Sequence, residues 1–297
     1  MSEQPPAPIV KVDGIYEVAR GLFVIPDLGV PLVPNIGVIV GNEAVLVVDT
    51  GMGPRNATNV LTRVDEIAAG KKIYLTTTHF HPEHSFGASV FAEHATVLVN
   101  RDQKVDLLNK GSGYLDFFRS FGDSVSRELE SVELIVPEKV YDDYFALDLG
   151  GRTVEMQAVG RAHTRGDQVI RVPDLGAIFC GDLVEESQFS IFPWFPPEDV
   201  DVSGVRWLNV IDRLINFQDK LVVPGHGRVG DGDLLREVYE YLNFLKREAW
   251  TRKGSGMDDD QIQGEIEAEA LTLHPSWVGR EWIEKGVQCL CSEFVPN

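Results

Sequence analysis

Thr78-His79-Phe80-His81-Pro82-Glu83-His84 is the stretch on which the interpretation of this sequence depends. It places three histidines and one carboxylate within six residues, although the whole chain has only seven histidines. The preceding residues 72–78 are apolar and β-branched, which predicts a strand. Proline is excluded from the interior of a regular helix, so Pro82 prevents a helix through the motif. The stretch therefore predicts a strand that ends in a rigid turn and presents imidazoles from a loop.

Clustered imidazoles indicate metal binding. Imidazole is the commonest metal ligand among neutral side chains, and borderline ions such as Zn²⁺ favour it. The competing interpretation is a polar turn with solvated histidines. Short histidine-rich tracts are typical of metal sites, so the sequence favours a metal site here.

The composition argues against several classes of partner. The chain has 297 residues, 43% of them hydrophobic, which is enough to bury a large core in one or two domains. With 27 basic and 46 acidic residues, its net charge is −19. This charge argues against a nucleic acid or an anionic membrane surface as a partner. High solubility is the simplest explanation of the acidity.

Several signals predict a cytoplasmic protein. Residues 1–8 lack the basic region and the apolar core of a signal peptide, and no apolar run approaches the ~18 residues of a membrane span. The three cysteines, Cys180, Cys289 and Cys291, form no CxxC motif and are expected to be thiols rather than metal ligands. An odd number of cysteines without an export signal is typical of a reducing compartment.

The pattern of apolar residues, glycine and proline predicts two similar halves, each with strands, a helix, a further strand and a loop. The predicted strands cover residues 16–25, 35–40, 44–49, 72–78, 96–99, 145–149, 152–159, 168–172, 177–180 and 221–223. The predicted helices cover residues 54–69, 86–94, 101–131 with a break at 111–113, 203–217, 231–252, 258–271 and 276–290. Two β-rich halves of this kind predict an αββα sandwich, in which two mixed β-sheets stack face to face with helices outside. We expect one domain over residues 1–297, with a flexible tail at 1–10 and a C-terminal helical extension at 253–297.

Three further stretches each place one polar residue at the end of a predicted strand. His163 lies in the polar turn of residues 160–167, Asp182 follows an apolar strand, and His226 lies between two glycines after another strand. Taken singly, these residues would be an ordinary turn histidine, a helix cap and a packed loop residue. Their shared position at strand ends, on loops with unusual backbone freedom, favours a common site.

In this order the residues resemble the motifs of the metallo-β-lactamase-fold hydrolases. The order is Asp49, the histidine cluster, His163, Asp182 and His226, and the resemblance covers roughly residues 16–252. The chain is most similar to the branch associated with quinoprotein relay systems. Members of that branch carry Asn-Ile-Gly at the second strand, Gly-Arg-Ala-His-Thr before the third ligand and a Tyr-Leu helix after the last histidine. The motifs are specific to the fold but weakly specific to the substrate, because the superfamily supports many hydrolyses and a few oxidations.

The resemblance implies a binuclear metal centre, with two Zn²⁺ ions per chain and with Fe and Mn as alternatives. It implies that His79, His81 and His163 hold one ion, that His84 and His226 hold the other, and that Asp182 bridges the two. Asp49 would orient ligand histidines without itself binding a metal, and Asp167 would do similar work.

Glu83 departs from the family motif, which has aspartate at this position. Its longer side chain either ligates the second ion or acts through water as a general base. In both cases Glu83 and Asp182 are expected to be catalytic, and the second ion is expected to bind more weakly than the first.

Metal-activated water is the chemistry that these residues can perform. Two neighbouring divalent ions lower the pKa of a shared water to yield hydroxide, and they neutralise a developing oxyanion. We therefore expect a metal-dependent hydrolase that cleaves an ester, lactone or amide bond of a small organic substrate with an apolar portion. One alternative is an iron-dependent oxidoreductase of the same fold, similar to persulfide dioxygenases. The other is a non-catalytic binding protein with a degenerate site.

The residues around the substrate are less well defined. Residues 27–34 form an apolar loop, and Phe192 and Trp194 lie in a segment that either walls an apolar pocket or covers the edge of the core. Arg165 either binds a substrate carboxylate or is a surface arginine. Tyr114, Phe117, Phe118 and Phe121 have helical spacing and are expected in the core or in an interhelical seam; the alternative is a helical insertion that covers the cleft. The sequence leaves open whether the chain forms a homo-oligomer.

Overall fold

A computed structural model describes residues 6–137 and 139–296 of the chain. Within these residues, the β-branched runs of the first half form a sheet of seven strands that follow one another in chain order. Its first four strands are antiparallel, and β4 to β7 are parallel. The strands are β1 (Tyr16–Ala19), β2 (Leu22–Ile25), β3 (Ile36–Val40), β4 (Ala44–Val48), β5 (Lys72–Thr76), β6 (Ala95–Asn100) and β7 (Lys139–Tyr141).

The second half of the chain forms a sheet of five described strands in the order β12-β11-β10-β9-β8. The pair β11 and β12 is parallel, and the other pairs are antiparallel. The strands are β8 (Tyr144–Asp148), β9 (Thr153–Ala158), β10 (Gln168–Val172), β11 (Ala177–Glu185) and β12 (Leu221–His226).

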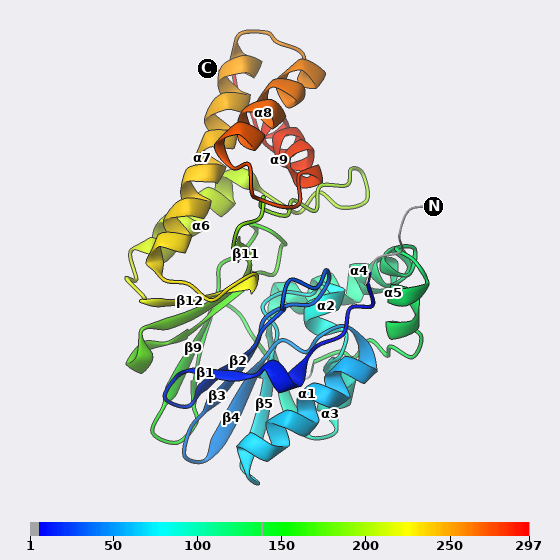
Figure 1. Cartoon of the computed structure of the whole chain (residues 1–297), viewed down its shortest axis with the longest axis vertical. Helices are drawn as coiled ribbons and strands as arrows, with labels where there is room; N and C mark the ends of the chain where they lie inside the picture. Colours follow the sequence, from blue (N-terminus) through cyan, green and yellow to red (C-terminus); the bar gives the residue numbers. More distant parts are fainter. Residues whose placement is uncertain (1–5, 138, 297) are drawn as a thin grey trace.

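The two sheets pack face to face through apolar side chains that alternate along their strands. Leu46 of β4, Ile170 of β10 and Phe179 of β11 belong to this shared core. Gly37 of β3 permits the contact, because a Cβ at this position would lie 2.4 Å from the ring of Phe179. Helices cover both outer faces (Figure 1), so the predicted αββα sandwich is confirmed.

One set of helices covers the first sheet. It comprises α1 (Gly53–Ala68), α2 (Pro82–Ser85), α3 (Ala88–Ala92), α4 (Arg101–Arg119) and α5 (Asp123–Glu128). The apolar face of α1 packs Val60 and Val64 against the outer face of the sheet. The break predicted in α4 at 111–113 is wrong. Gly111 is buried in this helix, and a Cβ at its position would lie 3.0 Å from Leu134.

A second set of helices packs against the other sheet and extends away from the sandwich, toward the top of Figure 1. It comprises α6 (Gly204–Ile215), α7 (Gly232–Gly254), α8 (Asp259–Leu273) and α9 (Glu281–Ser292). Ile266 of α8 and Val287 of α9 share one buried core with Trp207 of α6. Short 3₁₀ turns lie at η1 (Val12–Gly14) and η2 (Pro173–Leu175).

Other differences from the predicted elements have local causes. Residues 16–25 form a hairpin instead of one strand, because Gly21 turns the chain with φ +71°. Strand β7 was not predicted. Within the tail expected at 1–10, the Asn56 side chain donates to the Pro8 carbonyl and accepts from the Val10 N–H. Residues 1–5 of this tail lie outside the described residues. None of the described helices combines the length and the hydropathy that crossing a membrane requires.

Candidate metal centre

The predicted ligands come together at one edge of the sandwich. The loop after β5 carries His79 and His81, and the one-turn helix α2 carries Glu83 and His84. The other half of the chain contributes His163 from the turn before β10, Asp182 from β11 and His226 from the end of β12. Two glycines allow this convergence. A Cβ on Gly181 would lie 2.5 Å from Thr78, and a Cβ on Gly225 would lie 2.0 Å from Asp182 Oδ1.

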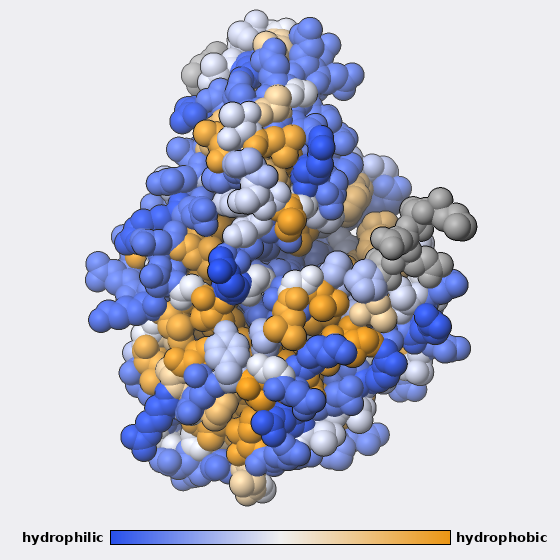
Figure 2. Space-filling model, in the orientation of Figure 1, coloured by the Kyte–Doolittle hydropathy of each residue, from blue (hydrophilic) through white to orange (hydrophobic). Residues whose placement is uncertain are grey.

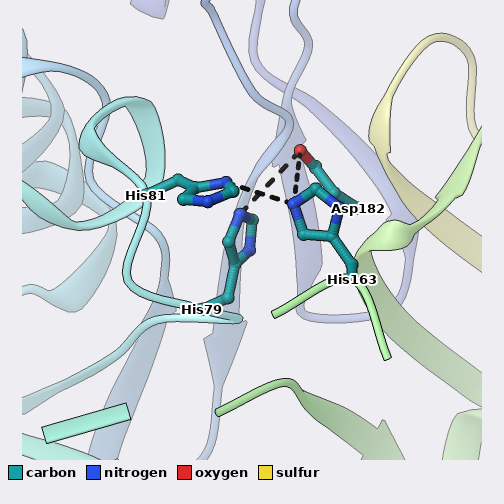
Figure 3. Close-up of side chains that lie close together, drawn as sticks. All are labelled: His79, His81, His163 and Asp182. Atoms are coloured by element: carbon teal, nitrogen blue, oxygen red, sulfur yellow. Dashed lines mark hydrogen bonds and ion pairs between the residues drawn. The ribbon is translucent and has the colours of Figure 1, made fainter. Parts of the chain in front are cut away.

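Three histidines and Asp182 form the first group of candidate ligands (Figure 3). The Nδ1 atom of His81 lies 3.1 Å from Nε2 of His163. The Nε2 atoms of His79 and His163 each lie 3.8 Å from Asp182 Oδ2. One ligand atom from each residue lies within 4.8 Å of all the others, a spacing that suits a single ion between them.

Glu83, His84, His226 and the same Asp182 form the second group. The other Asp182 oxygen, Oδ1, lies 3.2 Å from Nε2 of His84 and 3.6 Å from Nε2 of His226. Asp182 therefore offers one oxygen to each group. This is the arrangement of a carboxylate between two neighbouring ions.

Asp49 holds the histidine loop in place through hydrogen bonds. It accepts hydrogen bonds from the Thr78 N–H at 2.6 Å, from the Thr78 hydroxyl at 3.0 Å and from Nδ1 of His84 at 2.9 Å. The Thr78 hydroxyl, having donated its proton to Asp49, accepts from Nδ1 of His79 at 3.1 Å. Asp49 thus orients two candidate ligands, and it does so from a left-handed backbone conformation with φ +68°.

Main-chain carbonyls orient two more histidines. Nδ1 of His163 donates to the Ile191 carbonyl at 2.8 Å, and Nδ1 of His226 donates to the Val33 carbonyl at 2.9 Å. A neutral imidazole that donates from Nδ1 has its lone pair on Nε2. Both rings therefore direct an unprotonated nitrogen toward Asp182.

The charge state of the groups suits a cation. Burial lowers the pKa of His79 and His81 well below the usual value, and it lowers the pKa of His163 to about 4, so these rings are neutral ligands. Burial opposes the charge on Asp182, but the neighbouring His84 and His226 outweigh it and hold the pKa of Asp182 well below its usual value. His84 is the exception: burial disfavours its charge, but Asp182 and Asp49 raise its pKa, so its ring would have to release a proton to bind a cation.

The buried polar atoms of the site supply a direct test of whether the residues fit a metal. Among the described residues, Nε2 of His79, Nε2 of His84, Oε2 of Glu83 and both oxygens of Asp182 are buried without a hydrogen-bond partner. Leaving so many buried polar atoms unpaired is costly unless a cation satisfies them. Imidazole nitrogens and carboxylate oxygens are a donor set that fits Zn²⁺ and similar divalent ions.

Some residues proposed from the sequence lie elsewhere. Phe192 is fully buried and packs on Trp207 with ring centroids 5.0 Å apart, so its assignment to a pocket wall is wrong and the packed-loop alternative describes it. Trp194 is partly buried against the same core. Arg165 is half exposed and pairs with Asp102 at 3.4 Å, as a surface arginine does. Asp167 accepts hydrogen bonds from Thr164 and so shapes the turn that carries His163.

Other groups that orient the candidate ligands could not be recognised in the sequence. The Ile191 and Val33 carbonyls are main-chain atoms and leave no sequence signal. Tyr114 lies in the predicted interhelical seam, and its ring also stacks on His81. No feature of the sequence links the helix of Tyr114 to the histidine loop.

Two adjacent groups of histidine and carboxylate side chains at one edge of an αββα sandwich are typical of a class of metallohydrolases. Residues 29–226 match the model of the Metallo-beta-lactamase superfamily, and the chain belongs to this superfamily. Two groups of histidine and carboxylate ligands, as found here, fit the dinuclear metal site typical of the superfamily.

Curated relatives include two hydrolases with different substrates. An acyl-coenzyme A thioesterase, MBLAC2 of Homo sapiens, is 24% identical over 230 residues, which cover 70% of this chain and 78% of the relative. A metallo-beta-lactamase type 2 of Bacteroides fragilis is 23% identical over 218 residues, covering 71% and 76%.

Solved structures share the fold. A metallo-beta-lactamase from Pontibacter korlensis has a TM-score of 0.60 at 18% identity, over 77% of this chain and 98% of that one. The DIM-1 metallo-beta-lactamase has a TM-score of 0.59 at 17% identity, over 77% and 96%.

Proposed function

We propose that this chain is a hydrolase with two zinc ions that cleaves an ester, lactone or amide bond of a small organic substrate with an apolar portion. The observation that carries the proposal is the pair of buried ligand groups that share Asp182. When bound, two divalent ions supply an activated water and a Lewis acid for the scissile carbonyl.

The side chains of this site would hold the ions and control their charge. His79, His81 and His163 would supply neutral nitrogens to one ion, whereas Glu83 would bring a carboxylate to the other, together with His84 and His226. The ionised Asp182 belongs to both groups and would help to hold both ions. The second ligand group has two carboxylates, Glu83 and the shared Asp182, whereas the first group has only Asp182. The positive charge of the two ions would therefore be neutralised to different extents, and their affinities would differ.

The named relatives support acyl-bond hydrolysis as the reaction type. One is named an acyl-coenzyme A thioesterase and another a metallo-beta-lactamase. A thioester and a β-lactam are both acyl compounds, and the same metal-site chemistry would serve both.

The apolar portion of the substrate is suggested by the loop beside the second ligand group. Its Val33 carbonyl binds His226, and the Asn35 N–H donates to the Gly225 carbonyl at 2.8 Å, so the loop lies against the site. Leu28 on this loop is 58% exposed. Figure 2 shows a hollow in this face of the molecule with hydrophobic side chains along its border, which suits an apolar group.

A hydrolysis panel on protein of measured metal content tests the proposal. Aryl esters, acyl thioesters, lactones, phosphodiesters and β-lactams would be compared, and we expect turnover of acyl compounds that rises with chain length of the acyl group. One iron per chain together with oxygen uptake would contradict the proposal in favour of an oxidoreductase. Two bound ions without turnover of any member would contradict it in favour of a binding protein.

A further inference from the structure

His81 differs from the other candidate ligand histidines in how its ring is held. His79, His84, His163 and His226 each use the ring nitrogen that faces away from the site in a hydrogen bond. His81 faces the site through Nδ1, and its Nε2 is buried without a hydrogen-bond partner in the part of the chain that the structure describes. A ring without such a bond needs another restraint to keep a fixed orientation.

The ring of Tyr114 supplies that restraint. It stacks on His81 with centroids 5.0 Å apart and an interplanar angle of 21°. Phe80 closes the cluster from the side, with its centroid 4.9 Å from both rings. Stacked aromatic rings attract one another beyond the area that they bury, and the contact excludes rotation of the imidazole.

Tyr114 is itself fixed by charged residues. Its hydroxyl donates to Asp199 Oδ2 at 2.8 Å, and Lys110 Nζ binds the same carboxylate at 2.9 Å. Lys110 also contacts Asp201 at 2.8 Å and Asp106 at 3.7 Å. Helix α4, which carries Lys110 and Tyr114, is thereby clamped to the loop before α6.

We propose that Tyr114, held by Asp199 and Lys110, is the positioning residue of His81 and sets the affinity of the three-histidine group for its ion. This inference rests on the metal centre of the proposed function. It assigns to α4, which supplies no ligand, a specific effect on one of the two ions. Outer partners of metal ligands typically change metal affinity by about 10–100-fold, and we expect Tyr114 to act within that range.

Titration of the metal-free chain with Co²⁺ tests the proposal, because Co²⁺ absorption reports ligand geometry without any substrate. Tyr114→Leu removes the stacked ring and should weaken the ion at the three-histidine group by about 100-fold, with a changed absorption spectrum and little effect on the other ion. Tyr114→Phe keeps the ring but loses its bond to Asp199, and it should weaken the same ion by about tenfold.

Phe121→Leu is the matched control. Phe121 belongs to the same aromatic seam but contacts Phe117 and Phe118 rather than Tyr114 or His81. Its replacement should leave both affinities and the spectrum unchanged.

Three results would overturn the proposal. The first is wild-type affinity and spectrum in a folded Tyr114→Leu variant, or in Tyr114→Phe if the leucine variant does not fold. The second is equal weakening of both ions, and the third is an effect of the same size in Phe121→Leu. A wild-type chain that binds no Co²⁺ would overturn the proposed metal centre as well, which separates the two failures.

Discussion

Glu83 is the residue at which this chain differs from the superfamily motif, and its surroundings favour a ligand. Its side chain is buried at the start of α2, and one of its oxygens lies in the second ligand group. Burial raises the pKa of Glu83, and a bound cation would oppose that shift by favouring the charged form.

Replacing Glu83 by glutamine should remove the second ion and most of the activity. Glu83→Gln keeps the size of the side chain but removes its charge and its ability to act as a base. We expect kcat to fall by on the order of 10²-fold or more, the range typical of general acid–base groups. Metal stoichiometry and kcat measured on the same sample check this expectation.

Glu83→Asp is the conservative control. It retains a carboxylate, restores the residue usual in the superfamily and should keep two ions with much of the activity. Wild-type turnover with two tightly bound ions in Glu83→Gln would show that Glu83 has no part in the site.

Asp49 should affect metal binding without contacting a metal. Asp49→Asn replaces one acceptor oxygen by an amide donor, so the bonds from Thr78 and His84 can no longer all form. We expect metal affinity to fall by about 10–100-fold, measured by competition with a chromophoric chelator. Asp116→Asn, on the exposed face of α4, should change nothing. An unchanged affinity in Asp49→Asn would show that the loop keeps its geometry without this carboxylate.

At the scale of elements, the parallel strands β11 and β12 leave room for the Asp182 carboxylate because the facing residue on β12 is a glycine. A Cβ on Gly225 of β12 would lie 2.0 Å from Asp182 Oδ1, the oxygen that faces the second group. Gly225→Ala should displace Asp182 and abolish binding of at least one ion, as counted by metal analysis of the purified variant. Gly230→Ala is the control, because its nearest neighbour lies at an ordinary 3.4 Å. Two bound ions in Gly225→Ala would mean that β12 shifts freely.

Helix α4 offers a matched pair of glycines with opposite surroundings. A Cβ on the exposed Gly113 meets nothing within 4 Å, whereas one on Gly111 lies 3.0 Å from Leu134. Gly113→Ala should stabilise the protein by about 0.5–1 kcal/mol, because alanine loses less backbone entropy in a helix. In Gly111→Ala the close contact should offset this gain. Urea denaturation compares the two, and equal stabilisation of both variants would contradict the packing explanation of Gly111.

These elements also show what the sequence can and cannot predict. The spacing of His79, His81 and His84 could predict a metal site because ligand type and local order are sequence properties. The bond from His226 to the Val33 carbonyl spans 193 residues and involves a main-chain atom, so no pattern could indicate it. Gly111 was taken for a helix break because glycine marks both breaks and close contacts, and only the packing of Leu134 distinguishes them. Phe192 was ambiguous for the same reason, since an aromatic segment suits a core as well as a pocket.

At the scale of the whole molecule, the site joins the two halves of the sandwich. Asp49 and the histidine loop belong to the first sheet, whereas His163, Asp182 and His226 belong to the second. Each proposed ion would therefore contact residues from both sheets. Asp182 is buried and ionised at this junction, where its neighbours are Nε2 of His84 at 3.2 Å and Nε2 of His226 at 3.6 Å. A buried charge with so few partners disfavours close contact of the two halves unless a cation is bound.

Metal removal should consequently destabilise the entire fold rather than the site alone. A free ion at a hundred times its dissociation constant stabilises the folded chain by about 2.7 kcal/mol, provided that it does not bind the unfolded chain. For a chain of 297 residues, loss of one such ion corresponds to a decrease in Tm of roughly 4 °C upon chelation, and loss of two ions to about twice that. Calorimetry before and after verified metal removal measures the decrease, and activity should disappear in parallel. The variant His81→Ala, which lacks one of the three histidines of the first group, should show a smaller shift because it starts with less bound metal. An unchanged Tm with full activity in the verified metal-free protein would contradict both the centre and its role in joining the two sheets.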